Sequence, residues 1–366
     1  MRIIFTIILI ILLSSLKTHA QIVSTYAGTG GIGNQDGPRL TATFLTINYI
    51  TIDNQGNVYV SDYQGHKIRK ISTDGMVSTL AGTGVQGDIN GSGSSARLRF
   101  PTGIDVDSEG NVYFADSGNF KIKKITPSGF VTTVSGSGVM GDLDGAPNLA
   151  KFNLLYDLKV DHNGNIFVAD YEANKVKKII PDGTVSTYAG TGVLGETNGP
   201  ALSAMLNNPR GIAVDNLGNV FFSELRKIRK ISADGIVSDF AGSGNFSNTP
   251  IDGSGDMATF NNPRTLDIDS QGNIYAGEQE HTRIRKITPQ RFVSTYAGTG
   301  AVGNADGPAN MATFRNPNGV TVFQDTTLYI ADEGNRKVRK IESTIMSTSE
   351  PLGKSIRVGQ MEKIFL

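Results

Sequence analysis

The residues best suited to chemistry stand at one fixed place in a pattern that recurs along the chain. At this place, two successive positions are polar, charged or small. The first position holds Asn48, Thr102, Tyr156, Arg210, Arg264 and Asn318, and the second holds Tyr49, Gly103, Asp157, Gly211, Thr265 and Gly319. Phenol and guanidinium groups bind polar or anionic ligands through charge-assisted hydrogen bonds. The first set, together with Tyr49 and Asp157, is therefore the predicted ligand-binding site.

Tyr49, Tyr156 and Asp157 are of special interest because they break the internal pattern. Folding needs only the repeated residue, so a departure from the repeat indicates a function. A second interpretation is equally open. These side chains could fill the centre of the fold and pair with one another, since buried polar groups need partners in any case.

The same residues permit an alternative function, that of a metal-assisted lyase or hydrolase. In that case Tyr156 transfers a proton, Asp157 binds a cation or acts as the base, and the two arginines, Arg210 and Arg264, hold an anionic substrate. No cofactor is predicted for a binding function, whereas the enzymatic alternative would use calcium or zinc. The supply of zinc ligands is poor, because the chain has no Cys and only four His.

Six carboxylates form a second repeated set, each at the end of an expected strand. They are Asp62, Asp116, Asp170, Glu224, Glu278 and Asp332. Oxygen ligands of this kind could hold a cation. A carboxylate that recurs in every repeat is better explained by hydrogen bonds that fix the following turn, and we favour this interpretation.

The elements that must position these residues repeat six times. A basic and apolar pentapeptide, first seen at residues 67–71, closes each repeat at Ile71, Ile125, Ile179, Ile231, Ile287 and Ile341. The second period shows how a repeat is built, with expected strands at residues 101–107, 112–116, 121–125 and 130–136 separated by tight turns. Six four-stranded antiparallel sheets around one axis form an all-β, six-bladed β-propeller.

The register of the repeat predicts how the ring closes. One copy of the fourth strand precedes the first complete period, and the last period lacks a copy after Ile341. Residues 23–28 are therefore expected to complete the sixth blade beside residues 337–341, which would remove exposed sheet edges. In this fold the long loops and the turns after each second strand share one face, and the predicted site opens onto it.

The basic third strands raise the question of nucleic-acid binding, which we do not expect. Lys+Arg and Asp+Glu both number 34, so the formal net charge is zero, whereas a nucleic-acid site needs a concentrated basic patch. The basic side chains are expected to lie along the apolar sheet surface and to keep their charges in water.

Several stretches resemble the NHL-repeat family. They are the segment Pro209-Arg210-Gly211-Ile212-Ala213-Val214-Asp215 with Gly218-Asn219-Val220, the pair Ala169-Asp170 with Asn174, and the basic third strand. The resemblance extends over residues 22–341 and implies a six-bladed propeller. It implies no single activity, because similar propellers include protein- and RNA-binding domains, extracellular sensor domains and an amidating lyase that depends on a metal and histidines.

The N-terminus has the pattern of a secretory signal peptide. Arg2 precedes an apolar run at residues 3–13, and small residues precede an expected cleavage after Ala20. The propeller is then expected at residues 21–341, and residues 342–366 are expected to form a poorly ordered tail. Such a protein would be secreted or held in a bacterial cell envelope, without stable membrane insertion after cleavage.

These features together predict a non-catalytic module that binds a protein or a glycan through its loop-rich face. Export would also separate the chain from the usual RNA targets. The metal-assisted lyase or hydrolase with a site at the channel mouth remains the alternative.

Overall fold

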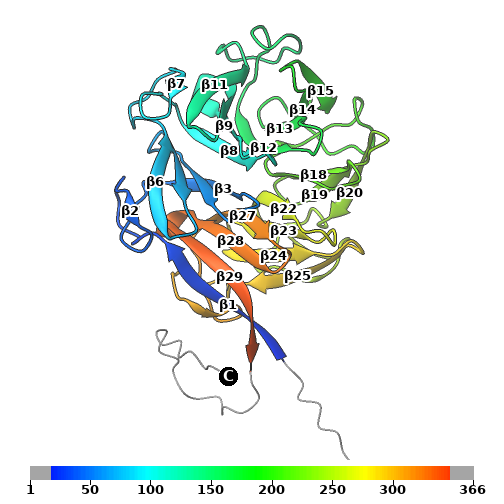
Figure 1. The fold of residues 1–366 in the computed structure, drawn as a ribbon. Coiled ribbons are helices and arrows are strands. Elements are labelled where there is room, and N and C mark those ends of the chain that lie inside the picture. The colour runs from blue at the N-terminus through cyan, green and yellow to red at the C-terminus, as the bar shows by residue number, and fades with distance from the viewer. Residues whose placement is uncertain (1–17, 347–366) are drawn as a thin grey trace, which may run out of the picture.

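The computed structural model describes residues 18–346, which fold into six antiparallel sheets around a central axis (Figure 1). This architecture confirms the predicted all-β, six-bladed β-propeller. The first strands of neighbouring blades contact one another in the closed order β3, β8, β12, β17, β22, β27. They therefore line the axis, and each blade extends outward from its first strand in sequence order.

The strands of the first three blades are as follows. Blade 1 contains β3 (Ile47–Ile52), β4 (Val58–Asp62), β5 (Lys67–Ile71), β6 (Met76–Ala81) and the short outer β2 (Gly37–Pro38). Blade 2 contains β8 (Pro101–Val106), β9 (Val112–Asp116), β10 (Lys121–Ile125), β11 (Phe130–Ser135) and the short outer β7 (Gly91–Ser92). Blade 3 contains β12 (Leu155–Val160), β13 (Ile166–Asp170), β14 (Lys175–Ile179) and β15 (Val185–Ala189).

The other three blades follow the same plan. Blade 4 contains β17 (Ile212–Val214), β18 (Val220–Ser223), β19 (Ile228–Ile231), β20 (Ile236–Ala241) and β16 (Gly199–Pro200). Blade 5 contains β22 (Pro263–Ile268), β23 (Ile274–Glu278), β24 (Arg283–Ile287), β25 (Phe292–Ala297) and β21 (Gly253–Ser254). Blade 6 contains β27 (Pro317–Phe323), β28 (Thr327–Asp332), β29 (Lys337–Met346), β1 (Thr18–Ala27) and β26 (Gly307–Pro308). Two 3-10 turns, η1 (Ser117–Asn119) and η2 (Glu333–Asn335), follow the second strands of blades 2 and 6.

The prediction of four strands per blade needs a correction, because five of the six sheets have a fifth strand. In blade 1, Gly37 pairs with Val77 and Pro38 with Met76. This glycine has φ +135, a conformation that residues with a side chain rarely adopt. The Asp-Gly and Asn-Gly dipeptides of the long loops therefore add a short outer strand that covers the blade edge. In blade 3 a single bridge between Gly145 and Val185 takes its place.

The predicted closure of the ring is confirmed. Strand β1 pairs antiparallel with β29, with Val23 opposite Ile341 and Gln21 opposite Ser343. The pairing continues outward to Thr18 opposite Met346, so β29 extends past the expected repeat boundary at Ile341. Figure 1 shows this two-stranded ribbon leaving the propeller at blade 6. The rest of the predicted tail, and most of the predicted signal peptide, lie outside the described residues.

The expectation for the basic third strands is wrong at their central position. The six residues at this position have no exposed surface: Arg69, Lys123, Lys177, Arg229, Arg285 and Arg339. Arg69 shows why, since its guanidinium donates to the backbone oxygens of Thr43 and Gln35 at 3.1 Å and lies 3.6 Å from Asp62. Each buried cation thus ties its strand to the long loop beside it, because a buried charge needs partners.

The carboxylates at the ends of the second strands accept hydrogen bonds, as the favoured interpretation predicted, but Asp62 and Asp170 fix the segment before the first strand rather than the turn that follows them. Asp62 accepts hydrogen bonds from the backbone N–H groups of Leu45 at 3.1 Å and Thr46 at 2.8 Å. Asp170 accepts from Asn153 and Leu154 in the same way. These bonds hold the segment that leads into the first strand, and they therefore position the residues at the channel mouth.

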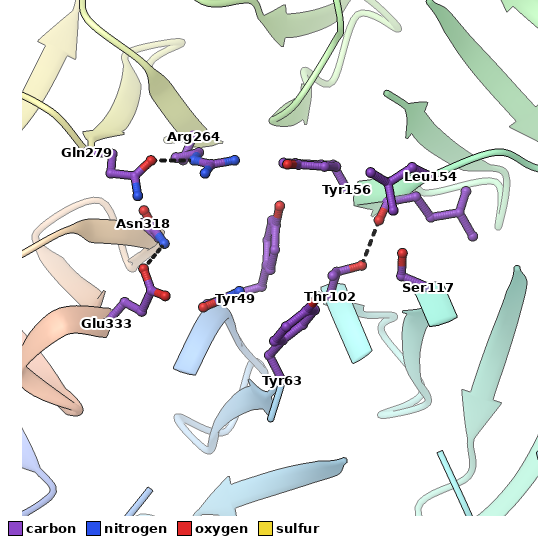
Figure 2. A pocket seen from close by; sticks show the side chains of 12 residues that line it. Tyr49, Tyr63, Thr102, Ser117, Leu154, Tyr156, Arg264, Gln279, Asn318 and Glu333 are labelled. Atoms are coloured by element: carbon purple, nitrogen blue, oxygen red, sulfur yellow. Dashed lines mark hydrogen bonds between the residues drawn. The ribbon is translucent and has the colours of Figure 1, made fainter. Parts of the chain in front are cut away.

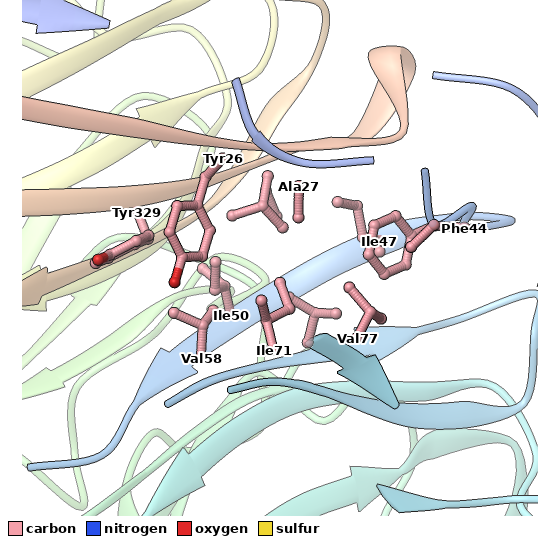
Figure 3. Packing of buried hydrophobic residues seen from close by; sticks show 13 residues of the cluster. Tyr26, Ala27, Phe44, Ile47, Ile50, Val58, Ile71, Val77 and Tyr329 are labelled. Atoms are coloured by element: carbon pink, nitrogen blue, oxygen red, sulfur yellow. The ribbon is translucent and has the colours of Figure 1, made fainter. Parts of the chain in front are cut away.

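Apolar side chains between neighbouring blades form the core. Figure 3 shows the cluster between blades 6 and 1, where Phe44, Ile47 and Val58 have no exposed surface. Tyr26 of β1 packs edge-on against Tyr329 of β28, with ring centroids 4.9 Å apart. The N-terminal strand is thus anchored by apolar packing as well as by its strand pairing. Within residues 18–346, no helix has the length and apolar character needed to cross a membrane.

Candidate ligand-binding site at the channel mouth

The beginnings of the first strands enclose a cavity of about 160 Å³ at the mouth of the central channel (Figure 2). The cavity is lined by Asn48, Tyr49, Tyr63, Thr102, Ser117, Leu154, Leu155, Tyr156, Arg264, Gln279, Asn318 and Glu333. Six of the eight predicted site residues are in this set, and the two that are not are Asp157 and Arg210. The structure therefore brings most of the predicted residues together around one space.

Asp157 is turned away from the cavity. Its carboxylate accepts hydrogen bonds from the backbone N–H groups of Leu158 at 2.9 Å and Ile212 at 3.1 Å. Burial raises the pKa of this carboxyl to about 7, against the opposing effect of Lys159. Each oxygen accepts one bond from the first strand of blade 3 or blade 4, and the carboxylate does not line the cavity, so it is not placed to act on a ligand there as the predicted cation ligand or base.

The repeat position of Asp157 alternates around the ring between glycine and larger residues, and Asp157 is one of the larger residues. Glycine occupies this position in blades 2, 4 and 6, and larger residues occupy it in blades 1, 3 and 5. A Cβ at Gly103 would lie 2.4 Å from the Asp157 Cα, and one at Gly211 would lie 2.4 Å from the Arg264 carbonyl oxygen. The alternation is thus a packing requirement, because each glycine admits the backbone of the next blade.

Arg210 lies next to the cavity without lining it. Its guanidinium stands over the Tyr171 ring at 5.3 Å, and Tyr171 in turn stacks on Tyr156 with a centroid distance of 4.4 Å. On the other side of Tyr156 the Arg264 guanidinium lies 5.4 Å from the ring centroid. Two arginines therefore enclose two stacked phenol rings, an arrangement that cation–π attraction stabilises. Tyr156 and Arg264 of this stack line the cavity on the side of blades 3 and 5.

Sequence reasoning missed a second group of lining residues, those that directly follow the carboxylate at the end of each second strand. In chain order they are Tyr63, Ser117, Tyr171, Leu225, Gln279 and Glu333. Four of them line the cavity, and Tyr171 supports Tyr156. The signal was present in the sequence, because this position varies in every repeat while the residue before it is always acidic.

The wall formed by blades 6 and 1 is rich in hydrogen-bond acceptors. The Asn318 amide donates to a carboxylate oxygen of Glu333 at 2.5 Å, which leaves the Asn318 Oδ1 buried without a partner. Within residues 18–346, the Oδ1 of Asn48 on blade 1 and the Oγ of Ser117 on the adjacent blade 2 are also buried without a partner. Burial raises the pKa of Glu333, while Arg264 and the Asn318 amide lower it. Unpartnered buried polar atoms are rare in proteins and point to a missing ligand or water.

The channel is closed one layer below the mouth. Lys159 lies 3.1 Å from Asp267 and 3.7 Å from Asp105, carboxylates from two other blades. Thr51 donates to Asp105 at 3.0 Å, and Thr321 donates to Asp267 at 2.9 Å. This cluster fills the channel with paired polar groups, so the interpretation that polar residues plug the centre applies to this layer. The cavity above this cluster is therefore a cup, open at the mouth of the channel and closed below.

No group of three or more His, Asp or Glu side chains in the described part of the chain is arranged to hold a metal ion. The Nδ1 of His66 accepts a hydrogen bond from the Phe100 N–H at 3.2 Å. His281 contacts Glu278 at 2.7 Å and the Ser247 carbonyl oxygen at 2.9 Å. The three residues named for catalysis that remain near the mouth are Tyr156, Arg210 and Arg264.

Comparison with known proteins identifies the same architecture. The model of the Teneurin NHL domain matches residues 192–259. NHL repeat-containing protein 2 from Bos taurus is 24% identical over an alignment of 333 residues that covers 80% of this chain and 46% of that protein. The chain thus spans about half the length, or less, of the curated relatives it matches.

Two solved structures share the fold. A protein of unknown function from Bacteroides thetaiotaomicron has a TM-score of 0.69 and 20% identity, covering 89% of this chain and 77% of that one. An auxiliary nutrient binding protein from the same organism has a TM-score of 0.67 and 18% identity, with coverage of 89% and 77%. At this identity the likeness shows the fold alone.

Proposed function

The chain belongs to the NHL-repeat family, and from this premise we propose that it is a non-catalytic binding module that recognises a glycan through its loop-rich face. The cavity at the channel mouth carries the proposal, because phenol, amide and guanidinium groups converge there around unpartnered buried polar atoms. Such sites fix the orientation of a polar ligand through a few placed hydrogen-bonding groups.

The cavity favours a glycan over a protein, the other partner predicted from the sequence. Its volume of about 160 Å³ suits a small polar unit, whereas pockets for drug-sized ligands are about 300–1,000 Å³. A protein interface would instead centre on a buried apolar or aromatic cluster. The mouth has polar groups on all sides, and the terminal unit of a saccharide chain matches both its size and its polarity.

The non-catalytic character of the proposal is supported by the placement of Asp157. Its two oxygens hold backbone N–H groups of blades 3 and 4. The enzymatic alternative assigned the cation or the base to this residue. Without it, Tyr156 and Arg264 are suited to binding, because both can donate hydrogen bonds to a ligand in the cavity.

A glycan array with the full chain tests the proposed function. We expect binding to a restricted set of saccharides, and Tyr63→Ala should weaken it at least about tenfold because the ring lines the cavity. The matched control is Tyr188→Ala, since Tyr188 packs on Phe167 away from the mouth. Absence of saccharide binding, or equal binding by both variants, would reject the proposal.

Export to the cell envelope is part of the same proposal. The predicted signal peptide supports it, as does the fold shared with an auxiliary nutrient binding protein of Bacteroides thetaiotaomicron. Cleavage after Ala20 would shorten β1 but keep Gln21 opposite Ser343 and all pairs inward of it. N-terminal sequencing of the protein from fractionated cells should find Gln21 in the envelope or medium, and an intact Met1 in the cytosol would contradict export.

A further inference from the structure

We propose that the group held at the channel mouth is an acidic sugar unit, a pyranose ring that carries a carboxylate. This inference rests on the proposed binding function and adds the chemical class of the ligand. It is drawn from three features of the cavity: a pole of donors that includes Arg264, a pole of unpartnered acceptors on neighbouring blades, and the aromatic rings that line the space.

Arg264 and two phenols form the donor pole. The Arg264 Nε donates to the Gln279 side-chain oxygen at 2.8 Å, and the same oxygen accepts from Asn262 at 2.6 Å. This pair fixes the guanidinium so that its end points toward the Tyr156 hydroxyl, and the Tyr49 hydroxyl rises toward both (Figure 2). A fixed guanidinium binds a carboxylate through two parallel hydrogen bonds.

Tyr49 strengthens the donor pole because its hydroxyl remains protonated and can donate a hydrogen bond. Burial raises the pKa of its phenol well above the usual value, and the nearby Asp157 adds to the effect. The hydroxyl therefore keeps its proton throughout the physiological range. An anion at this place would accept hydrogen bonds from the guanidinium and from the phenols, while the carboxyl of the nearby Asp157 is engaged by the backbone N–H groups of Leu158 and Ile212.

The acceptor pole lies on blades 6 and 1. Asn318, which is 6% exposed, donates its amide N–H to Glu333. Its Oδ1 has no hydrogen-bond partner within residues 18–346. The Oδ1 of Asn48 is the second unpartnered acceptor there. A buried acceptor without a partner costs about 1–3 kcal/mol. Sugar hydroxyls are donors that would supply these partners, and Ser117 could serve a further hydroxyl.

The rings of Tyr49, Tyr63 and Tyr156 line the cavity (Figure 2). They offer apolar faces to the carbon skeleton of a sugar ring, while their hydroxyls remain available for hydrogen bonds. A single pyranose fits a cup of about 160 Å³ that is closed below by the Lys159 cluster. A larger saccharide would enter by one end and extend outward.

The negative charge of Glu333 favours a carboxylate over a phosphate as the anionic group of the ligand. Within residues 18–346 one guanidinium, that of Arg264, lines the cavity, and Glu333 lines it from the neighbouring blade 6. A doubly charged phosphate would be repelled by Glu333 without a second cation to compensate. A singly charged carboxylate placed against Arg264, with neutral hydroxyls against Glu333, satisfies both walls.

Calorimetric titration of the full chain with matched oligosaccharides tests the inference. One ligand ends in a hexuronic acid, and the other has the corresponding neutral hexose in the same linkage. We expect the acidic ligand to bind at least about tenfold more tightly, since a hydrogen bond to a charged group is stronger than a neutral one. Arg264→Gln should remove this preference, so that the acidic and neutral ligands bind to the variant with equal affinity.

The control and the outcomes keep the two proposals distinguishable. Arg97→Gln removes an exposed arginine of a long loop and should keep the preference intact. Equal binding of the acidic and neutral ligands would overturn the acidic class and leave the glycan-binding function standing. Tighter binding of inorganic phosphate or of a free amino acid would also overturn it. If no saccharide binds, the proposed function fails together with this inference.

Discussion

At the scale of single residues, the basic position of the third strand shows how a repeated side chain can be structural. Four blades use arginine there, and two use Lys123 and Lys177. The lysines meet an extra loop carboxylate, Asp88 or Asp142. The arginines reach two loop carbonyl oxygens instead, as Arg69 and Arg339 do. Residue type and loop conformation are therefore matched within each blade.

This match predicts that Arg69→Lys destabilises the protein. The ammonium group of lysine has no planar fork, so it cannot donate to Thr43, Gln35 and the carboxylates together. We expect the free energy of unfolding to fall by about 2 kcal/mol, measured by chemical denaturation. The exposed Arg97→Lys serves as control, and equal stability of both variants would contradict the role of the guanidinium.

Asp157 gives a pH-dependent prediction at the same scale. Burial raises its pKa to about 7 in the folded protein, compared with about 3.9 in an unfolded chain. Between these values the folded state holds a proton that the unfolded state has released, so the free energy of unfolding falls as the pH rises. Asp157→Asn lacks this dependence.

The stability of Asp157→Asn relative to the parent protein should therefore increase from pH 4 to pH 8. Denaturation curves at several pH values measure it. The substitution also weakens one hydrogen bond to the backbone, which shifts the difference by a constant amount and leaves its pH dependence intact. A difference that stays constant over this range would show that Asp157 does not titrate as proposed.

At the scale of elements, the close packing of the first strands around the axis holds the residues at the channel mouth in place. Glycines of blades 2, 4 and 6 allow these strands to approach the next blade closely. The long loops hold the strands from outside through the carboxylates of the second strands, such as Asp62. The mouth residues are therefore carried on backbone that is fixed from both sides, which suits a site that must hold a ligand in one orientation.

Gly103→Ala should disturb this arrangement. The added Cβ would lie 2.4 Å from the Cα of Asp157, and backbone at that distance must move. We expect a loss of about 1–3 kcal/mol in the free energy of unfolding and weaker ligand binding at the mouth. Gly31→Ala is the control, because its added Cβ meets only the Thr29 hydroxyl at 3.3 Å. An unchanged melting temperature for Gly103→Ala would reject the packing argument.

At the scale of the whole molecule, closure of the ring decides whether six blades act as one unit. Strand β1 joins blade 6 to the start of the chain through pairing with β29 and β26. It also contributes Tyr26 and Val23 to the apolar clusters on either side. Without it, β29 and β26 would present unpaired edges, which favour aggregation.

Deletion of residues 18–27 should therefore abolish the cooperative unfolding transition. Calorimetry of the truncated protein should show a broad transition or none, together with an increased tendency to aggregate. A synthetic peptide of residues 18–27 should restore part of the transition by adding the missing strand. A truncated protein that melts as sharply as the parent would show that closure by β1 is dispensable.

The sequence by itself determined the number of blades, four of the strands in each blade and the closure by the N-terminal strand, but not the short outer strand. These features follow from local periodicity and a constant repeat length, which residues near one another in sequence can encode. It also identified Asn48, Thr102, Tyr156, Arg264 and Asn318 as mouth residues, because their position in the repeat fixes their height along the axis.

The tertiary structure alone decided which side chains face one another. Arg264 and Tyr156 are far apart in sequence, and Glu333 meets Asn318 only because β27 and the turn after β28 share one end of blade 6. Asp157 does not line the cavity, and its two oxygens instead accept hydrogen bonds from backbone N–H groups of two blades. Contacts of this kind depend on how closely neighbouring blades approach, and the repeat pattern of one strand does not encode that distance.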